Sequence, residues 1–220
     1  MENLTLVIPA KKEAESLPSV FKEIENLKCY KIVILEENDN ETIDSIKDFD
    51  KKIIFQKGKG YGNAIITGIN HVQTEYLCIF NADGSFNPNE LTNLLKNCQN
   101  FDYVFASRYL KNATSEDDTY LTKLGNFFFT FLGNLLFSLK LSDILYTFVL
   151  GKTKSFKSLD LKEDNFCLCV EIPINAKKMN QTFTHIPSNE RKRIAGKKKV
   201  KEFSDGLKIL KYMFYRYIKK

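Results

Sequence analysis

Asn81, Asp83 and Ser85 follow one another at a spacing of two, directly after an apolar run over residues 76–80. A short apolar run between polar residues is typical of a buried parallel strand, and Gly84 allows a tight turn behind it. Ligands of open α/β sheets collect at the carboxyl ends of such strands. A carboxylate in that place can hold a divalent cation, and the cation can clamp a diphosphate. The alternative for Asp83 is a structural role as the cap of the next helix.

Charged residues also come soon after four other apolar runs that are typical of strands. They are Glu13 after residues 4–8, Glu37 after residues 31–35, Lys59 after residues 52–55 and Arg108 after residues 103–106. The carboxyl ends of parallel strands share one edge of a sheet. We therefore expect these four side chains and Asp83 to line one crevice, the usual form of a small-molecule site.

Helical patterns alternate with these runs, which predicts an α/β fold with a Rossmann-like, mostly parallel central sheet flanked by helices. Apolar residues at helical spacing predict one helix over residues 13–26. Further helices are expected after the turn at residues 38–42, from the glycine-rich residues 58–62 to about Val72, and near residues 88–98.

With 220 residues, 43% of them apolar and 27% charged, the chain has the size and composition of one globular domain, or one domain with an appendage. The five cysteines are an odd number without the spacing of a metal site, so we expect reduced thiols. Cys167 and Cys169 would face the same side of a strand. The first strand begins close to Met1, so no signal peptide is expected and a cytoplasmic protein is favoured.

Positive charge is concentrated at the C-terminal end. Residues 191–220 hold 12 Lys and Arg against 2 Asp and Glu, a net charge of +10, which leaves −4 for the rest of a chain whose formal net charge is +6. A basic tail suggests an anionic partner such as phosphate groups, a membrane surface or nucleic acid, and a merely solvated tail is the alternative. No RNA- or DNA-binding motif is present, so nucleic acid is not expected as the partner.

Two stretches could meet a membrane surface. Within residues 125–141 a polar residue recurs every four positions, at Asn126, Thr130, Asn134 and Ser138, with a wide arc of Phe and Leu opposite. This run is shorter than the ~20 residues of a spanning helix, so it is expected to lie in a membrane interface or to pack against the protein. The tail over residues 203–220 also has helical spacing, with one face formed by Leu207, Leu210, Phe214 and Tyr217. Basic and aromatic residues together favour peripheral association with an anionic inner membrane face.

Taken in order, the polar motifs resemble those of family-two glycosyltransferases with the GT-A fold. The motifs are Val7-Ile-Pro-Ala-Lys-Lys-Glu-Ala-Glu15, Glu36-Glu37-Asn38, Gly58-Lys59-Gly60, Asn81-Ala82-Asp83 and Ser107-Arg108-Tyr109. The run from Glu190 to Lys199 is similar to the basic motif of the polyprenyl-phosphate branch, which includes dolichol-phosphate mannose synthases. The resemblance implies a catalytic domain over residues 1–200, including an apolar interface helix over 120–141, and a basic amphipathic helix over 201–220.

The resemblance also implies roles for individual residues. The donor would be bound by Pro9, Ala10, Glu13, Glu37, Lys59, Asn81, Asp83 and Arg193. Asp83 and Ser85 would hold the metal ion, Mg²⁺ or Mn²⁺. The acceptor phosphate would be bound by Arg108, Lys123 and Lys199. Catalysis is expected from Asp83, Arg108, Lys123 and Asp143.

Several positions depart from the family's pattern. Asn81 replaces the first Asp of the Asp-x-Asp motif, and Ser85 stands where a Gln ligand often sits. Lys12 replaces an Asn, and Glu36-Glu37 replaces an Asp-Asp pair. The segment after Asp143 lacks the family's usual Arg. Glu171 resembles the acid of a strand that precedes the basic motif.

The reaction implied is the transfer of a sugar, with inversion, from a nucleotide-diphosphate-sugar to a lipid-linked acceptor such as a polyprenyl phosphate. A phosphate monoester has a second pKa of about 6, so such an acceptor is largely ionised at neutral pH and needs little base catalysis. A hydroxyl acceptor would need a general base, for which Asp143 is the candidate. Two other functions stay open: a nucleotidyltransferase that releases pyrophosphate, and a non-catalytic protein that binds nucleotide or membrane.

Overall fold

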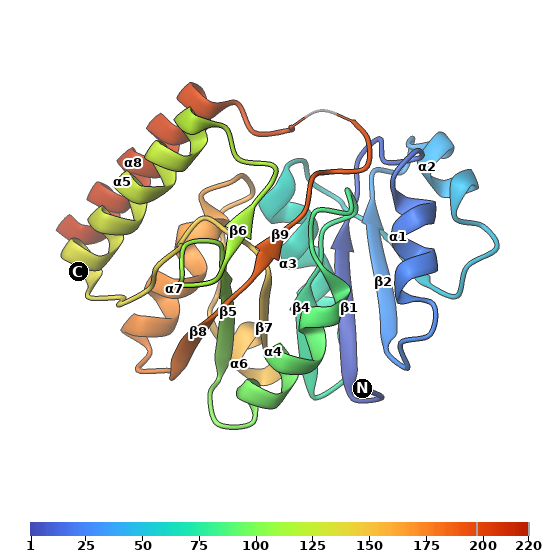
Figure 1. The fold of residues 1–220 in the computed structure, drawn as a ribbon, viewed down its shortest axis with the longest axis horizontal. Coiled ribbons are helices and arrows are strands. Elements are labelled where there is room, and N and C mark those ends of the chain that lie inside the picture. The colour runs from blue at the N-terminus through green and yellow to red at the C-terminus, as the bar shows by residue number, and fades with distance from the viewer. Residues whose placement is uncertain (197, 220) are drawn as a thin grey trace.

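A central sheet forms the middle of the molecule in the computed structural model, which describes residues 1–196 and 198–219 (Figure 1). Over these residues the sheet has seven strands in the order β3-β2-β1-β4-β7-β5-β8. Their bounds are β1 Leu4–Pro9, β2 Tyr30–Leu35, β3 Lys52–Phe55, β4 Tyr76–Ile79, β5 Tyr103–Ser107, β7 Val149–Lys152 and β8 Phe183–Pro187. Strand β7 is antiparallel to β4 and β5, and the other pairs are parallel. The mostly parallel sheet predicted from the alternating pattern is therefore confirmed.

Helices cover both faces of the sheet and bury its side chains in two apolar clusters. Their bounds are α1 Leu17–Ile24, α2 Asn40–Ser45, α3 Tyr61–His71, α4 Leu91–Cys98 with the preceding 3₁₀ turn η1 Pro88–Glu90, α6 Thr153–Ser158 and α7 Leu168–Lys178. The first helix begins four residues later than expected. Glu13 instead opens a turn, in which its carbonyl oxygen accepts hydrogen bonds from the backbone N–H groups of Ser16 and Leu17. Pro18 then lies in the first turn of α1, where a missing N–H costs nothing.

Helix α7 corrects the prediction of a strand around Glu171 and the two nearby cysteines. Glu171 lies in its first turn, Cys169 lies within it, and Cys167 is its N-terminal cap residue. Every residue from Leu168 to Ala176 is buried, so the helix shows no amphipathic period in the sequence. A short apolar run of this kind cannot be assigned to strand or helix from periodicity alone.

A small second sheet joins two segments that are far apart in the sequence. It pairs β6, Thr114–Ser115, with β9, Asn189–Glu190, in parallel. The hydroxyl of Ser115 also donates a hydrogen bond to Glu190 Oε2. This pairing brings the basic C-terminal segment to the carboxyl edge of the main sheet (Figure 1).

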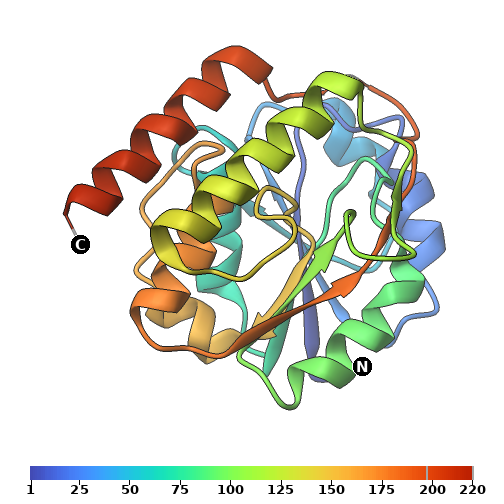
Figure 2. The same ribbon diagram turned by 60° about the vertical axis from the view of Figure 1, so that its left-hand side comes forward.

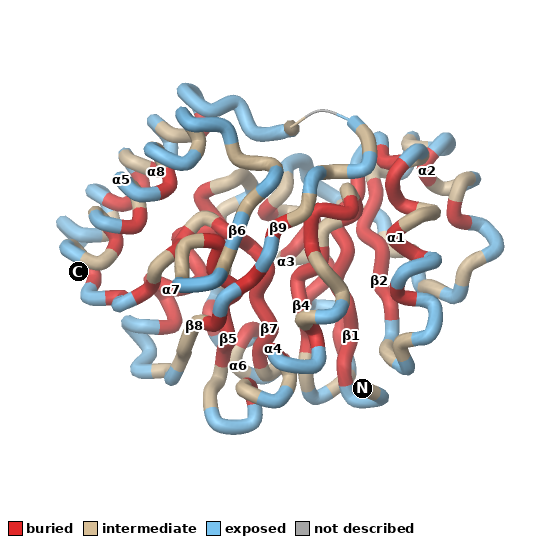
Figure 3. The backbone as a smooth tube through the Cα atoms, in the orientation of Figure 1, coloured by how far each residue is buried: buried red, intermediate tan, exposed pale blue. Residues whose placement is uncertain are grey.

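Helices α5, Tyr120–Phe137, and α8, Glu202–Ile218, pack side by side beyond the β8 edge (Figures 1 and 2). The polar stripe of α5 faces inward, with Asn126 and Thr130 buried. Its outward side is apolar and exposed, and Figure 3 shows the exposed outer sides of both helices. In the part of the chain that is described, neither these helices nor any other combine the length and apolarity that crossing a membrane requires.

The apolar stripe of α8 that packs inward consists of Ile209, Tyr212 and Met213, which belong to the larger core cluster. The outward residues of α8 include Leu207, Phe214 and Ile218, with 58%, 46% and 80% of their surface exposed. The expected division of the chain at residue 200 stays a prediction, although α8 shares the core of the rest of the molecule.

Two helical glycines predict opposite effects on stability. A Cβ atom at Gly68 in α3 would lie 2.4 Å from Val7 Cγ1 and 2.8 Å from Ile34 Cδ1, whereas a Cβ at Gly125 in α5 meets nothing within 4 Å. Gly68→Ala should lower the free energy of unfolding by about 1–3 kcal/mol through overpacking. Gly125→Ala should raise it by about 0.5–1 kcal/mol, since alanine favours a helix. Denaturant unfolding of both variants checks the signs, and a stabilising Gly68→Ala would contradict the packing of α3 on β1 and β2.

Candidate active site

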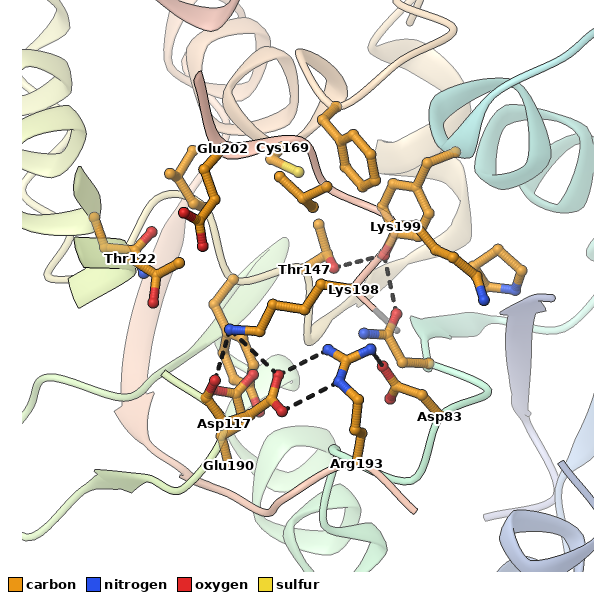
Figure 4. Close-up of a pocket in the computed structure, with 18 of the residues that line it drawn as sticks. Asp83, Asp117, Thr122, Thr147, Cys169, Glu190, Arg193, Lys198, Lys199 and Glu202 are labelled. Carbon is orange, nitrogen blue, oxygen red and sulfur yellow. Dashed lines mark hydrogen bonds and ion pairs between the residues drawn. The ribbon is translucent and has the colours of Figure 1, made fainter. Parts of the chain in front are cut away.

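A cavity of about 650 Å³ opens at the carboxyl edge of the sheet, where the strands end in polar residues. Glu13 after β1, Asp83 after β4 and Arg108 after β5 all line it, so the expected crevice is confirmed for these three. Pro9, Ala10, Asn81, Arg193 and Lys199, all expected to bind donor or acceptor, line it as well. Figure 4 shows how side chains from the C-terminal segment reach across this cavity toward the strand ends.

The turn after β4 fixes the position of Asp83. Gly84 has a φ of +81°, which favours glycine, and the Ile194 side chain occupies the space where a Cβ atom at Gly84 would lie. Asp83 Oδ1 accepts hydrogen bonds from the Ser85 backbone N–H, at 3.1 Å, and from the Ser85 hydroxyl, at 2.7 Å. The second oxygen, Oδ2, lies 3.4 Å from Arg193 Nη1. The turn therefore holds one carboxylate oxygen and presents the other to a cation.

Arg193 lies between two carboxylates (Figure 4). Besides Asp83, it contacts Asp117 through two parallel hydrogen bonds, Nε to Oδ1 at 3.2 Å and Nη2 to Oδ2 at 2.7 Å. Lys198 adds a second cation, with its Nζ 2.6 Å from the Asp117 carbonyl oxygen and 3.7 Å from Oδ2. Burial works to raise the pKa of Asp117, but the hydrogen bonds and charge of Arg193 outweigh it and hold that pKa below its ordinary value.

Glu13 and Lys199 form a second ion pair at the cavity wall. Lys199 Nζ lies 3.1 Å from Glu13 Oε1, and the Ser16 hydroxyl donates to Glu13 Oε2 at 2.6 Å. The backbone N–H of Glu13 donates to the Thr42 hydroxyl. The Glu13 side chain is thus fixed at the end of β1, and Lys199 reaches it from a segment almost 190 residues later.

Asn81, in the place of the first Asp of the motif, belongs to a neutral network. Tyr61 donates to Asn81 Oδ1 at 3.0 Å and also lies 2.7 Å from the Thr147 hydroxyl. Burial raises the pKa of Tyr61, so its hydroxyl stays protonated and able to donate. The amide oxygen of Asn81 therefore has a donor of its own, and Asp83 supplies the carboxylate of the turn.

Arg108 has partners that differ from the expected phosphate. It holds Asp143 with Nε to Oδ2 at 2.7 Å and Nη2 to Oδ1 at 3.1 Å, and its Nη1 lies 3.4 Å from Asp118 and 3.3 Å from Glu190. Burial alone would lower the pKa of Arg108, but the charge of Asp143 raises it well above its usual value. Burial raises the pKa of Glu190, and the charge of Arg108 offsets part of that effect.

Five expected site residues do not line the cavity. Asp143 is buried and both its oxygens bind Arg108, so the geometry argues against a free general base there. Ser85 is buried with its hydroxyl on Asp83, which leaves it unsuited to the metal role. Lys123 lies one residue past Thr122 on α5 and is turned to solvent, since successive helical residues differ by about 100°.

The other two are Glu37 and Lys59. Glu37 is exposed and its neighbour Glu36 lines the cavity, paired with Lys11 at 2.6 Å, because side chains alternate at the end of a strand. Lys59 is exposed beside Gly60, which caps α3 and lines the cavity.

Sequence reasoning missed several polar residues that line the cavity, among them Tyr61, Asp117, Asp118 and Glu190. Asp117 and Asp118 could have been identified from the acidic run directly before Thr119, which is the N-cap residue of α5. Glu190 is the first residue of the basic motif, and no role of its own was predicted for it from the sequence. Asp117 and Asp118 do not directly follow a strand of the main sheet. Glu190 comes soon after β8, but no strand was expected there, so the rule of strand ends does not find any of the three.

The far end of the cavity is apolar and lies between α5 and α8. Its apolar lining consists of Leu121, Phe129, Phe203 and Ile209 with Gly206, and the polar Thr122, Asn126 and Glu202 of the same two helices also line the cavity. Gly206 leaves ordinary contact distance, 3.7 Å, between an added Cβ atom and the Phe129 ring. The cavity thus combines an ionic end that suits phosphate groups and a cation with an apolar end that suits a hydrocarbon chain.

The family model described as "Glycosyl transferase family 2" matches residues 5–160. Among solved structures, one of glucosyl-3-phosphoglycerate synthase from Mycobacterium tuberculosis in complex with uridine-diphosphate has a TM-score of 0.77 at 13% identity, over 97% of this chain and 79% of that one. Mannosyl-3-phosphoglycerate synthase from Rubrobacter xylanophilus gives a TM-score of 0.71 at 11% identity, over 98% and 74%. At such identities these likenesses show the fold alone.

Removal of the buried Arg108 guanidinium should lower the stability of the protein by an amount that depends on pH. Arg108→Ala leaves Asp143, Asp118 and Glu190 without their shared cation, and should lower the free energy of unfolding at pH 7.5 by about 3–5 kcal/mol. Burial raises the Glu190 pKa and Arg108 lowers it, so without Arg108 the folded variant takes up a proton at a higher pH than the wild type does and gains more stability as pH falls. The deficit should therefore shrink between pH 7.5 and pH 5.

Denaturant unfolding of wild type and variant at the two pH values measures this difference. Lys162→Ala is the control, because Lys162 forms an exposed pair with Asp160 and should change stability by less than about 0.5 kcal/mol. A deficit of equal size at both pH values would rule out uptake of a proton by this cluster.

Proposed function

The chain belongs to glycosyl transferase family 2, and on that basis we propose that it transfers a sugar, with inversion, from a nucleotide-diphosphate-sugar to a lipid-linked phosphate acceptor at a membrane surface. The observation that carries the proposal is one continuous cavity that is ionic at the strand ends and mainly apolar between α5 and α8. A donor diphosphate suits the first end and the chain of a lipid acceptor suits the second. The polyprenyl-phosphate branch, which the basic motif resembles, is the finer assignment proposed here.

A divalent ion, Mg²⁺ or Mn²⁺, would be held in this cavity by one carboxylate together with the donor phosphates. Within residues 1–196 and 198–219 no three His, Cys, Asp or Glu side chains are grouped so as to hold an ion by themselves. Such ions are commonly held by one or two carboxylates together with substrate phosphates and water. Asp83 Oδ2 is suitably placed for this, since Oδ1 is already held by Ser85. A similar solved structure, of glucosyl-3-phosphoglycerate synthase, is described as a complex with Mn²⁺ and uridine-diphosphate.

The residues of the cavity would act on the departing diphosphate. When bound at Asp83, the ion would supply positive charge to the phosphate oxygens on which negative charge develops. Arg193, Lys198 and Lys199 supply further cations from the C-terminal segment. Pro9, Ala10 and Glu36 line the part of the cavity at the ends of β1 and β2, where the donor nucleoside would lie.

The hydrogen bonds that Asp143 accepts from Arg108 are consistent with a phosphate acceptor. A hydroxyl acceptor needs a general base, and this candidate base is bound to Arg108 through both oxygens. An acceptor phosphate carries its negative charge already at neutral pH and can attack the sugar carbon without losing a proton to the protein. The similar synthases are described with phosphoglyceric acid, so a soluble phosphorylated acceptor is the competing outcome that the assay must distinguish.

The outward faces of α5 and α8 supply the proposed membrane contact. Leu124, Phe128, Phe131 and Leu135 project from α5 with 59%, 50%, 65% and 63% of their surface exposed. Lysines and arginines of α8 and the segment before it give this region its positive charge. Apolar contact and attraction to anionic lipids together provide the two signals that stable peripheral binding requires.

Transfer of label from radioactive nucleotide-sugars into the organic phase, with polyprenyl phosphate in vesicles, tests the reaction. Asp83→Asn should reduce turnover at least about 100-fold while the protein stays folded, because it removes the turn carboxylate that faces the diphosphate. Asp160→Asn, at an exposed site, is the control and should be fully active. Label in a water-soluble product would favour a soluble acceptor, release of pyrophosphate a nucleotidyltransferase, and full activity of Asp83→Asn would refute the proposed site.

Co-sedimentation with vesicles tests the membrane contact. The double variant Phe131→Ser/Leu135→Ser should bind anionic vesicles at least about tenfold more weakly than wild type, since burying even one such apolar side chain is worth about 1.5–3 kcal/mol and 1.4 kcal/mol is a factor of ten. Phe55→Ser is a matched control, because Phe55 is also exposed, at 45%, but lies on β3 at the opposite edge of the sheet. Binding to anionic vesicles should weaken at high salt. Equal loss in both variants would exclude the α5 face as the contact.

A further inference from the structure

The guanidinium of Arg193 contacts the Asp83 carboxylate oxygen that a metal ion would bind. Asp83 Oδ1 is held by the backbone and hydroxyl of Ser85, and Oδ2 lies 3.4 Å from Arg193 Nη1. The side chain of Asp83 is 13% exposed, so its carboxylate needs a counter-ion. A divalent ion on Oδ2 would stand within a few ångströms of the guanidinium, and the two like charges would repel.

Arg193 has a second anchor that allows it to leave Asp83 without becoming unpaired. Its two hydrogen bonds to Asp117, at 3.2 and 2.7 Å, have the bidentate geometry of a strong arginine–carboxylate contact. The contact with Asp83 is single and longer. The backbone holds the segment beside the turn, because the Ile194 N–H donates to the Asp83 carbonyl oxygen at 2.8 Å. Nε and Nη2 serve Asp117 and only Nη1 faces Asp83, so Arg193 can give up Oδ2 and keep its hydrogen bonds to Asp117.

We propose that Arg193 is an exchangeable counter-ion of Asp83: it neutralises the carboxylate when no metal is bound, yields Oδ2 to the divalent ion, and stays held by Asp117 above the donor diphosphate. Asp117 is thus a positioning residue, which acts on the metal site through Arg193. The inference rests on the proposed use of a divalent ion at Asp83. It does not depend on which sugar or acceptor is used.

The proposal predicts that substitutions of Arg193 and of Asp117 change the affinity for Mn²⁺ in opposite directions when no nucleotide is present. Arg193→Gln removes the competitor, so Mn²⁺ should bind up to about fivefold more tightly than to wild type, the range expected for losing one partly exposed ion pair. Asp117→Asn frees the guanidinium to turn fully toward Asp83, so Mn²⁺ should bind more weakly. The fall of the free-ion signal in electron paramagnetic resonance, measured on the full chain without nucleotide, reports both affinities.

A double variant separates this exchange from a general effect of charge. If Asp117 acts through Arg193, then Asp117→Asn should change Mn²⁺ affinity little in the Arg193→Gln background. If Asp117 acts only through its own charge, it should lower the affinity by the same factor in both backgrounds. Lys198→Gln is the matched control for charge, since Lys198 contacts Asp117 and has no contact with Asp83. It should strengthen Mn²⁺ binding less than Arg193→Gln does.

Three results would overturn the exchange: Mn²⁺ affinity unchanged in Arg193→Gln, equal effects of Asp117→Asn in both backgrounds, or no Mn²⁺ binding even when Arg193 is replaced. Thermal unfolding shows which variants are folded, and Arg193→Lys, which keeps the charge but not the planar fork, should fall between wild type and Arg193→Gln. Asp83→Asn should lose the binding in every background. Because no donor is present, a failed exchange is distinguishable from a failed transferase assignment, which the labelled-sugar assay decides.

Discussion

Carboxylates crowd the carboxyl edge of this sheet, and the rest of the site is arranged to neutralise them. Glu13, Glu36, Asp83, Asp117, Asp118 and Glu190 all line one cavity. Partly buried negative charges at this density are unfavourable unless each has a cation or donor nearby. Lys11 from the turn after β1 and Arg108 from the end of β5 serve three of them. The others depend on Arg193, Lys198 and Lys199, which makes the C-terminal segment part of the folded site.

The sequence allowed the sheet, most helices and one wall of the cavity to be predicted, because these depend on local periodicity. Strand ends carry polar residues at fixed places, and parallel strands bring those places together. Asp83, Glu13 and Arg108 were found in this way. Glu37 was expected in the cavity, but its neighbour Glu36 lines it instead. Successive side chains of an extended chain point to opposite sides, so an error of one residue places the wrong carboxylate in the cavity.

What could not be predicted depends on contacts between distant segments. Asp117, Asp118 and Glu190 meet because β6 pairs with β9 across 75 residues. The same pairing brings Asp118 and Glu190 to Arg108, and Asp143 reaches it from the segment before β7, so the fold supplies three carboxylates where the motif indicated a phosphate ligand. Helix α7 was misread as a strand because burial on all sides removes the periodic signal. The polar stripe of α5 was visible in the sequence, but its inward direction follows from packing on the domain.

The short ladder of β6 and β9 ties the evolution of two loops together. One loop carries Asp117 and Asp118 into the cavity, and the other carries Glu190 and Arg193, with Ser115 bound to Glu190 at the junction. A substitution that reshapes either loop displaces the ionic partners of the other. Changes of substrate preference that arise here should therefore come as matched changes in both loops. A chimaeric enzyme that takes one loop from a relative needs the second loop from the same source.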